Sequence, residues 1–287
     1  MNPKDRAGIV EACTELVMSL NHCSDNHEYD RSVRHLHAFV REVRPNFDEW
    51  GRAIAFLTET GQMCDDKRQE FILLSDTLGV SMLVDAINHQ MPQGATETTV
   101  LGPFFVADAP ELPLGADISP DVEGEPMFVS GTVTTPDGKP IAGAIVDTWH
   151  SDDDGHYDVQ QLDELRHLSM RARFRTDAGG RFHFRTIKAA AYPIPVDGPV
   201  GKMLEAQGRH PWRPAHVHFM VAAPGFVPLV THVFEAGDSY LDSDAVFGVK
   251  DSLIAPWHRH PAGKAPDGTA VERPFYTLDY AFGLKPA

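Results

Sequence analysis

Hydrophobic positions in the first hundred residues recur at intervals of three and four, which is the spacing of one face of an α-helix. The pattern predicts four consecutive helices. Their apolar stripes, in chain order, are Ile9, Cys13, Leu16, Val17 and Leu20; then Val33, Leu36, Val40 and Val43; then Phe47, Trp50, Ile54 and Leu57; and finally Phe71, Leu74 and Leu78.

Residues with known end preferences mark where these helices begin and end. Asp30 and Asn46 are suited to cap the second and third helices, and Pro45 ends the second. We expect the apolar stripe of the third helix to face inward and Gly61 to lie past its end. A fourth helix is expected to begin near Asp65, with Gly79 interrupting it before a further segment at 82–87.

From about residue 127 the period changes to two, which is typical of strands that are half buried. Strands are predicted at 128–134, 141–149, around Phe174, at 182–184, 215–221, 227–234 and 275–280, with turns at 136–138 and 177–180. Short strands without helices between them indicate a sandwich or barrel. The predicted fold class is therefore α+β: a helical domain over 1–100, followed by an antiparallel β-sandwich over 101–287.

Charge and composition exclude several classes of protein. The net charge is −16 and no run of Lys and Arg occurs, which argues against nucleic-acid binding. The stretch 214–234 has no charged residue, but its three prolines favour sheet over a membrane span. With only Cys13, Cys23 and Cys64, and no apolar signal-peptide core at the N-terminus, we expect a cytoplasmic protein without a disulfide framework.

The strongest local motif is His216-Val217-His218, in a chain that has 15 histidines. In a strand, residues i and i+2 point to the same face, so the two imidazoles converge and can bind a metal as neutral donors. Two surface histidines are the alternative. Further ligands stay open from spacing alone: the acidic triplet 152–154, five other histidines (His150, His156, His183, His210 and His232) and six tyrosines all qualify.

Six segments resemble the intradiol ring-cleaving dioxygenases, non-haem Fe(III) enzymes that open catechols between the two hydroxylated carbons. The resemblance runs from about residue 5 to 280 and is carried by 68–76, 99–104, 147–150, 155–157, 192–195 and 213–218. Within this family the chain resembles the hydroxyquinol 1,2-dioxygenases in particular, through 74–79 and 100–104. His232 departs from the glutamine of catechol 1,2-dioxygenases, which weakens plain catechol as the preferred substrate.

The resemblance implies that Tyr157, Tyr192, His216 and His218 hold the iron. This ligand set is chemically sensible, because phenolates are hard anionic donors that suit Fe(III) and partly neutralise its charge. It further implies that Tyr192 accepts a proton from the substrate and that Arg213 stabilises negative charge on the ring. The substrate and co-substrate would be a small aromatic diol or triol and O2.

The same resemblance implies a substrate pocket. Its residues would be Leu73, Asp76, Val100, Leu101, Gly102, Pro103, Phe104, Pro195, Val196 and His232. We hypothesise that Asp76 accepts a hydrogen bond from the third hydroxyl of hydroxyquinol; the alternative is that Asp76 only caps or pairs within its helix.

The N-terminal helices of this family link a homodimer and can hold a phospholipid. The stripe Ile9, Leu16, Leu20 and Leu36 could supply that apolar surface, or could form an intramolecular core instead. Three competing functions stay open: a catechol or chlorocatechol 1,2-dioxygenase, a non-catalytic β-sandwich binding module, and a zinc hydrolase that uses His216, His218 and a carboxylate.

Overall fold

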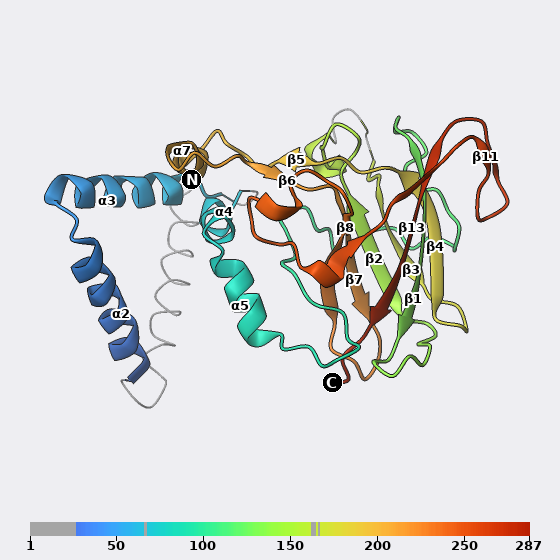
Figure 1. The fold of residues 1–287 in the computed structure, drawn as a ribbon, viewed down its shortest axis with the longest axis horizontal. Helices are drawn as coiled ribbons and strands as arrows, with labels where there is room; N and C mark the ends of the chain where they lie inside the picture. The colour runs from blue at the N-terminus through green and yellow to red at the C-terminus, as the bar shows by residue number, and fades with distance from the viewer. Residues whose placement is uncertain (1–26, 66–67, 162–164, 166) are drawn as a thin grey trace. The chain divides into compact units, whose positions relative to one another are not determined.

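The computed structural model describes the chain except residues 1–26, 66–67, 162–164 and 166. The chain divides into two compact units, residues 1–71 and 72–287 (Figure 1). The first predicted helix, with the stripe Ile9 to Leu20, lies outside the described residues. Among the residues described, no helix is long and apolar enough to cross a membrane.

The first unit contains α2 (His27–Val43) and α3 (Phe47–Gln62). Asn46 caps α3 as predicted: its side-chain oxygen accepts from the Glu49 backbone N–H at 2.9 Å, and the Glu49 carboxylate accepts from the Asn46 N–H at 2.8 Å. This reciprocal capping box satisfies two donors that a helix start otherwise leaves free. Gly61 was predicted past the helix end but lies in its last turn, because α3 continues to Gln62.

The apolar stripe of α3 does not face inward, so that prediction was wrong. Phe47 is 89% exposed and Trp50 is 56% exposed, and Ile54 and Leu57 are also exposed. In α2, Leu36 and Val40 are exposed in the same way. Periodicity predicts that a helix has an apolar face, but it cannot predict which surface covers that face.

The division between the two units falls within α4 (Glu70–Thr77), which is followed by α5 (Val80–Asn88). Gly79 separates them as predicted, since its backbone has a left-handed φ of 72° that ends one helix and precedes the next. The start of the fourth helix was predicted near Asp65, and the structure places it at Glu70.

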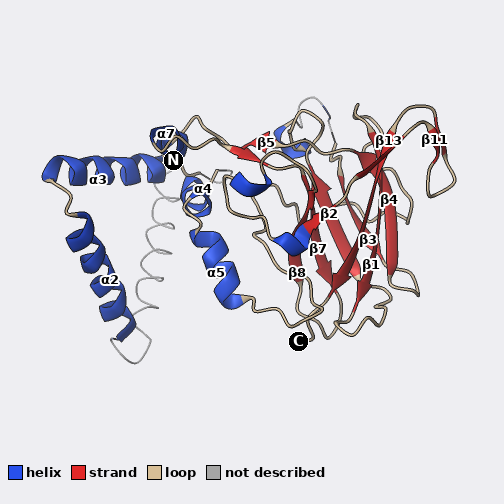
Figure 2. Ribbon diagram, viewed as in Figure 1, coloured by secondary structure: helices blue, strands red, loops and turns tan. Residues whose placement is uncertain are grey.

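Two mixed sheets form the body of the second unit (Figure 2). The four-stranded sheet has the order β10 (His258–His260), β13 (Phe275–Gly283), β1 (Pro126–Thr134), β4 (Arg181–Ile187). The five-stranded sheet has the order β3 (Arg171–Arg175), β2 (Ile145–His150), β7 (His216–Ala222), β8 (Leu229–Glu235), β9 (Ile254–Ala255).

Short elements complete the unit. They are two strand pairs, β5 (Tyr192–Pro193) with β6 (Trp212–Arg213) and β11 (Gly263–Lys264) with β12 (Ala270–Val271), the helix α7 (Pro199–Ala206), and the 3-10 turns η1 (Asp158–Gln160), η2 (Leu241–Ser243) and η3 (Asp251–Leu253).

The α+β fold class is confirmed: helices precede a domain that consists mostly of sheet. Three details differ from the prediction. The sheets are mixed because β1 pairs parallel with β13 and β8 with β9, whereas only antiparallel pairing was expected. The strand predicted from Ile141 begins at Ile145, after a turn at 142–143. Helix α7 lies between strands, where no helix was expected.

The hydrophobic core contains side chains from both main sheets. Val217 and Phe219 of β7 belong to it, together with Phe182 and Phe184 of β4 and Phe282 of β13. Because strand residues alternate in direction, His216 and His218 point to the opposite face of the five-stranded sheet. The uncharged stretch 214–234 thus forms β7 and β8, as the prolines predicted.

Candidate metal centre

A row of four side chains crosses the outer face of the five-stranded sheet. Strand register aligns Arg171 with Trp149, Trp149 with His218, and His218 with His232. All four are buried, with at most 3% of their surface exposed. The predicted convergence of His216 and His218 is confirmed, because their Nε2 atoms lie 3.2 Å apart.

The two predicted tyrosines meet this pair of histidines. Tyr157 precedes η1, and its Oη lies 3.0 Å from His218 Nε2. Tyr192 lies on β5, and its Oη is 3.5 Å from Tyr157 Oη. Tyr157 is fully buried and Tyr192 is 6% exposed. Two oxygen and two nitrogen donors from distant parts of the chain therefore converge on one point.

These separations fit a single bound ion. Donors that share an ion at about 2.1 Å lie about 3.0–3.4 Å apart at ordinary coordination angles, and the donor distances here run from 3.0 to 3.5 Å. The His216 Nδ1–H donates to the Pro214 carbonyl at 2.7 Å, which leaves the Nε2 lone pair free for a metal. The hard phenol oxygens favour a hard cation such as Fe(III).

Burial sets the protonation state of the donors in the absence of a cation. It lowers the pKa of His216 to about 3, with a further contribution from the Arg213 cation. It also lowers the pKa of His218 and of His232 well below the ordinary value, and raises the pKa of Tyr157 well above its usual value. The imidazoles are thus neutral donors, and a bound cation is needed to ionise the Tyr157 phenol.

His232 is the third imidazole of this cluster. Its ring lies 4.1 Å from the His218 ring and 4.8 Å from the His216 ring, between centroids, and the ligand atoms of the three histidines lie within 4.8 Å of one another. Neither of its ring nitrogens has a hydrogen-bond partner, although the Val100 backbone lies close enough to raise its pKa against the effect of burial. Within the described part of the chain, no carboxylate joins this cluster, contrary to the zinc-hydrolase alternative.

Aromatic side chains enclose the donors. The Phe104 ring stacks on the Tyr157 ring with centroids 4.3 Å apart and 21° between the planes. Gly155 allows the two tyrosines to approach, because it has a φ of +87° and a Cβ there would lie 2.7 Å from the Cβ of Tyr192. These contacts hold the two phenol rings in place.

Arg213 supplies a buried positive charge beside the donors. Its Nη1 lies 3.4 Å from Tyr192 Oη, and its Nε and Nη2 donate to the two oxygens of Asp244 at 3.1 and 3.3 Å. Burial acts to lower the pKa of Arg213, but the Asp244 carboxylate together with the Tyr192 and Tyr157 oxygens raises it above its ordinary value. Gly248 N–H also donates to Asp244, at 2.9 Å. The Arg213 guanidinium therefore stays charged and fixed in orientation.

The predicted pocket residues fall into two groups. Asp76 is buried on α4: burial raises its pKa, while a hydrogen bond from Ser81 and the charge of Arg213 act against this rise. Leu73 packs against the apolar cluster that contains Ile194 and Leu204. Gly102 faces His218, with 3.3 Å between a Cβ built there and His218 Cε1. Leu101, Pro103, Pro195 and Val196 are exposed.

The other candidate ligands lie outside the donor cluster and have other contacts or are exposed. Asp152 accepts hydrogen bonds from the backbone N–H groups of Asp154 and His156, so the acidic triplet forms a turn. His150 is buried on the inner face of its strand, with Thr186 Oγ1 2.7 Å from its Nε2. His210 bonds to Ser243. His156 and His183 are exposed.

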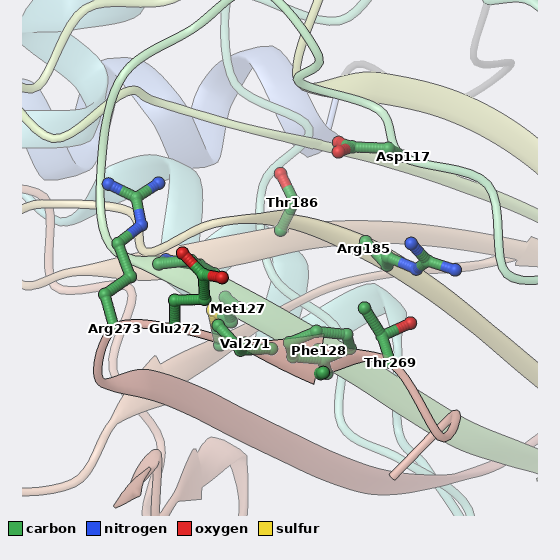
Figure 3. Close-up of a pocket in the computed structure, with 11 residues that line it drawn as sticks. Asp117, Met127, Phe128, Arg185, Thr186, Thr269, Val271, Glu272 and Arg273 are labelled. Atoms are coloured by element: carbon green, nitrogen blue, oxygen red, sulfur yellow. The ribbon is translucent and has the colours of Figure 1, made fainter. Parts of the chain in front are cut away.

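Two cavities lie outside the donor cluster. One, of about 520 Å³, lies between the four-stranded sheet and the β11–β12 hairpin, and Asp117, Arg185, Thr269 and Glu272 are among its lining residues (Figure 3). None of the predicted site residues lines it. A second, of about 440 Å³, is lined by Arg209, His210 and Phe247 among others, and it reaches the site only through Asp244.

Sequence reasoning missed three residues that the structure places around the centre: Trp149, Asp244 and Arg171. Trp149 lies within a segment that carried the family resemblance, which is a signal that could have identified it. Asp244 is 31 residues from its partner Arg213, and no local pattern connects the two.

This mixed β-sandwich brings two phenols and two imidazoles together in a buried centre whose donor atoms could hold one metal ion. Comparison with known protein families shows which class of protein has this fold and these donors. The family model described as "Dioxygenase" matches residues 100–285, and the model "Catechol dioxygenase N terminus" matches residues 29–96. The chain belongs to the intradiol ring-cleaving dioxygenase family. The interpretation as a non-catalytic binding module is thereby set aside.

Individual relatives share most of the length of this chain. It is 58% identical to the 6-chlorohydroxyquinol 1,2-dioxygenase of Cupriavidus pinatubonensis, over 88% of each chain. It is 53% identical to the hydroxyquinol 1,2-dioxygenase of a Rhizobium species, over 88% of this chain and 86% of the relative. The solved structure of hydroxyquinol 1,2-dioxygenase from Pseudomonas putida DLL-E4 superposes with a TM-score of 0.87 at 45% identity, covering 98% of this chain and all of that one.

Proposed function

We propose that this enzyme cleaves hydroxyquinol (benzene-1,2,4-triol) with O2 between the two adjacent hydroxylated carbons. Both oxygen atoms enter the product, 3-hydroxy-cis,cis-muconate, which tautomerises to maleylacetate. The observation that carries the proposal is the convergence of Tyr157, Tyr192, His216 and His218, with donor atoms 3.0 to 3.5 Å apart, beside a buried arginine. The names of the relatives above support the choice of substrate.

Fe(III) is the proposed cofactor, held by Tyr157, Tyr192, His216 and His218. When bound, it supplies a Lewis acid and a template that accepts the two adjacent oxygens of the substrate. The donor set supports a trivalent cation, because burial disfavours the phenolate form of Tyr157 unless a strong positive charge compensates it.

Tyr192 is the proposed proton acceptor. Its Oη lies next to the Arg213 guanidinium, at 3.4 Å, and the residue is 6% exposed, whereas Tyr157 is fully buried. As a phenolate at the edge of the centre, Tyr192 can move away, take a substrate proton at Oη and so become a neutral phenol, while Tyr157 keeps its place. Arg213, fixed by Asp244, then stabilises negative charge that develops on the ring.

Substrate selection is proposed to depend on Asp76. It is buried and close enough to Arg213 for the two charges to interact, which supports a place in the pocket wall. A buried acceptor that plain catechol leaves unpaired disfavours catechol strongly. Leu73, Val100, Gly102, Phe104 and His232 would line the same pocket, with Leu101, Pro103, Pro195 and Val196 at its rim.

A substrate panel tests this proposal against the catechol and chlorocatechol alternatives. Oxygen consumption is measured with hydroxyquinol, catechol and 4-chlorocatechol. We expect kcat/KM for hydroxyquinol to exceed that for catechol by about tenfold or more, since unpaired buried polar groups discriminate strongly. Equal or higher values for either catechol would contradict the choice of substrate.

The helical part of the chain is proposed to link a homodimer, with residues 1–100 as the linker and 101–287 as the catalytic domain. The exposed apolar faces of α2 and α3, which include Phe39, Phe47 and Trp50, support this and could also hold a phospholipid. Light scattering of wild type and Trp50→Glu, with lipid extraction, tests both ideas. We also propose a cytoplasmic location, which cell fractionation tests; the free Cys64 thiol is consistent with it.

A further inference from the structure

Arg171 lies at one end of the row of four side chains that crosses the five-stranded sheet, and each of its three side-chain nitrogens donates a hydrogen bond. It is 3% exposed, and Asp158 is fully buried. Its Nε donates to Asp158 Oδ2 at 2.6 Å, its Nη2 donates to Asp158 Oδ1, and its Nη1 donates to the Phe104 carbonyl at 2.9 Å. Asp158 also accepts backbone N–H bonds from Val159 at 2.8 Å and Ser169 at 3.0 Å.

Both partners of Arg171 adjoin Tyr157, each from a different direction. Asp158 follows Tyr157 directly in the chain, so fixing its carboxylate fixes the backbone that carries the phenol. Phe104 stacks on the Tyr157 ring at 4.3 Å, so fixing its carbonyl fixes the ring's packing surface. One guanidinium thus ties together two segments that are more than fifty residues apart and that meet at a single side chain.

We propose that Arg171 is a positioning residue that sets the orientation of the Tyr157 phenol and, through it, the geometry of the metal centre. This inference rests on the proposed function, in which Tyr157 is a metal ligand. Substituting a residue that holds a metal ligand in its orientation typically lowers metal affinity or activity about 10- to 100-fold.

Stability alone is a weak reason for this buried ion pair. Desolvating two charges offsets most of their attraction, and well-packed apolar residues often serve a fold equally well. An arginine has a specific advantage here, because its planar fork donates to both carboxylate oxygens and still has a third nitrogen for a carbonyl. A lysine keeps the charge but, as a compact point donor, cannot hold all three acceptors in this arrangement.

The same strand offers a control with the same kind of contacts in a less buried position, since the side chain of Arg173 is 28% exposed and that of Arg171 is 2% exposed. Arg173 lies two residues further on β3, on the same face of the sheet. It pairs with Asp147, with Nε to Oδ1 at 2.8 Å and Nη2 to Oδ2 at 3.0 Å, and it also donates to a loop carbonyl, that of Ala107, at 3.3 Å. Neither of these partners precedes, follows or stacks on Tyr157, so Arg173→Lys makes the same chemical change without the proposed link.

The experiment compares full-length wild type, Arg171→Lys and Arg173→Lys after loading with Fe(III). The readouts are the energy of the visible phenolate-to-iron absorption band, the iron retained after dialysis against a chelator, and kcat and KM separately. In Arg171→Lys we expect the band to shift, iron affinity to fall about 10- to 100-fold, and kcat to fall more than KM changes. Arg173→Lys should match wild type in all of these.

Two further variants keep the inference open to contradiction. Phe104→Leu removes the stacked ring and should shift the same band, and the double variant with Arg171→Lys should shift it by less than the sum of the two single shifts, because part of the effect of Arg171 passes through the Phe104 ring. If Arg171→Lys does not fold, Asp158→Asn, which keeps an acceptor for Arg171, must shift the band in its place.

A band position and iron affinity in Arg171→Lys (or in Asp158→Asn) equal to those of Arg173→Lys would overturn the positioning role. A wild type that binds iron without any visible band contradicts the proposed iron ligands instead, so the two failures are distinguishable.

Discussion

The indole of Trp149 lies flat against the imidazole of His218, with ring centroids 4.6 Å apart and planes 15° from parallel. The two residues are register partners on β2 and β7, so the sheet itself fixes this contact. The Trp149 indole fills the space on one side of the His218 imidazole, and the Nε2 atom of His218 is directed at the Tyr157 oxygen. A core tryptophan thereby determines how a metal ligand is presented.

Trp149→Leu should therefore lower iron retention about tenfold or more, because a leucine cannot hold the imidazole plane, and it should lower kcat as well. Iron content after dialysis and thermal unfolding are the measurements. Trp257→Leu is the matched control: Trp257 is also buried, its Nε1 also lacks a partner, and it belongs to the hydrophobic core. If both variants lose stability but retain iron equally, the orienting role of Trp149 is wrong.

Arg213→Lys should lower kcat by about 100-fold, the usual effect of removing a donor aimed at developing negative charge. A lysine ammonium cannot both pair with Asp244 and reach Tyr192 Oη as the guanidinium does. Asp244→Asn should have a similar effect on kcat and should destabilise the fold by about 3–5 kcal/mol, because it leaves a buried charge unpaired. Steady-state kinetics and urea unfolding check both; a kcat within twofold of wild type would contradict them.

Asp76→Ala should reduce the preference for hydroxyquinol over catechol, measured as the ratio of the two kcat/KM values, by about tenfold or more. The expected cause is loss of an acceptor for the third hydroxyl. Asp85→Asn serves as the control, since Asp85 is equally buried but bonds to His89, Thr98 and Lys250. It should lower stability and leave the ratio unchanged. An unchanged ratio of the two kcat/KM values in Asp76→Ala would show that Asp76 only caps or pairs within its helix.

His150 should make the iron-loaded enzyme less stable in acid. Burial lowers its pKa to about 4 from an ordinary value of 6.5. Below pH 6.5 the unfolded chain therefore binds a proton that the folded protein refuses, and stability falls until about pH 4, by about 3 kcal/mol in total.

His150→Gln removes the imidazole that takes up this proton. The fall in the free energy of unfolding between pH 6.5 and 4 should therefore become less steep, by up to about 1.4 kcal/mol per pH unit. Urea unfolding at several pH values measures the slope. Parallel curves for variant and wild type would show that His150 does not account for the acid sensitivity.

The parts of the site that sequence could predict are those that depend on local geometry. Strand alternation alone places His216 and His218 on one face, and the structure agrees. Capping chemistry alone identifies Asn46, and a glycine alone marks the break at Gly79. Each of these depends on residues within a few positions of one another.

Other features depend on chain segments that meet only after folding. Nothing local brings Tyr157 to Tyr192, 35 residues away, and only family resemblance singled out those two tyrosines. Asp244 and Arg171 were missed for the same reason. The apolar stripe of α3 shows a different limit: its period correctly predicts a helix, but the buried or exposed state of Trp50 depends on a surface that the pattern does not describe.

Isotope incorporation tests the central claim most directly. The iron-loaded enzyme is mixed with hydroxyquinol without oxygen, doubly labelled O2 is then admitted, and the ring-opened acid is analysed by mass spectrometry before it exchanges with water. Intradiol cleavage predicts that both labelled atoms enter the product, one in each new carboxyl group. A product with one labelled atom or none, or a ring opened outside the two hydroxylated carbons, would contradict it.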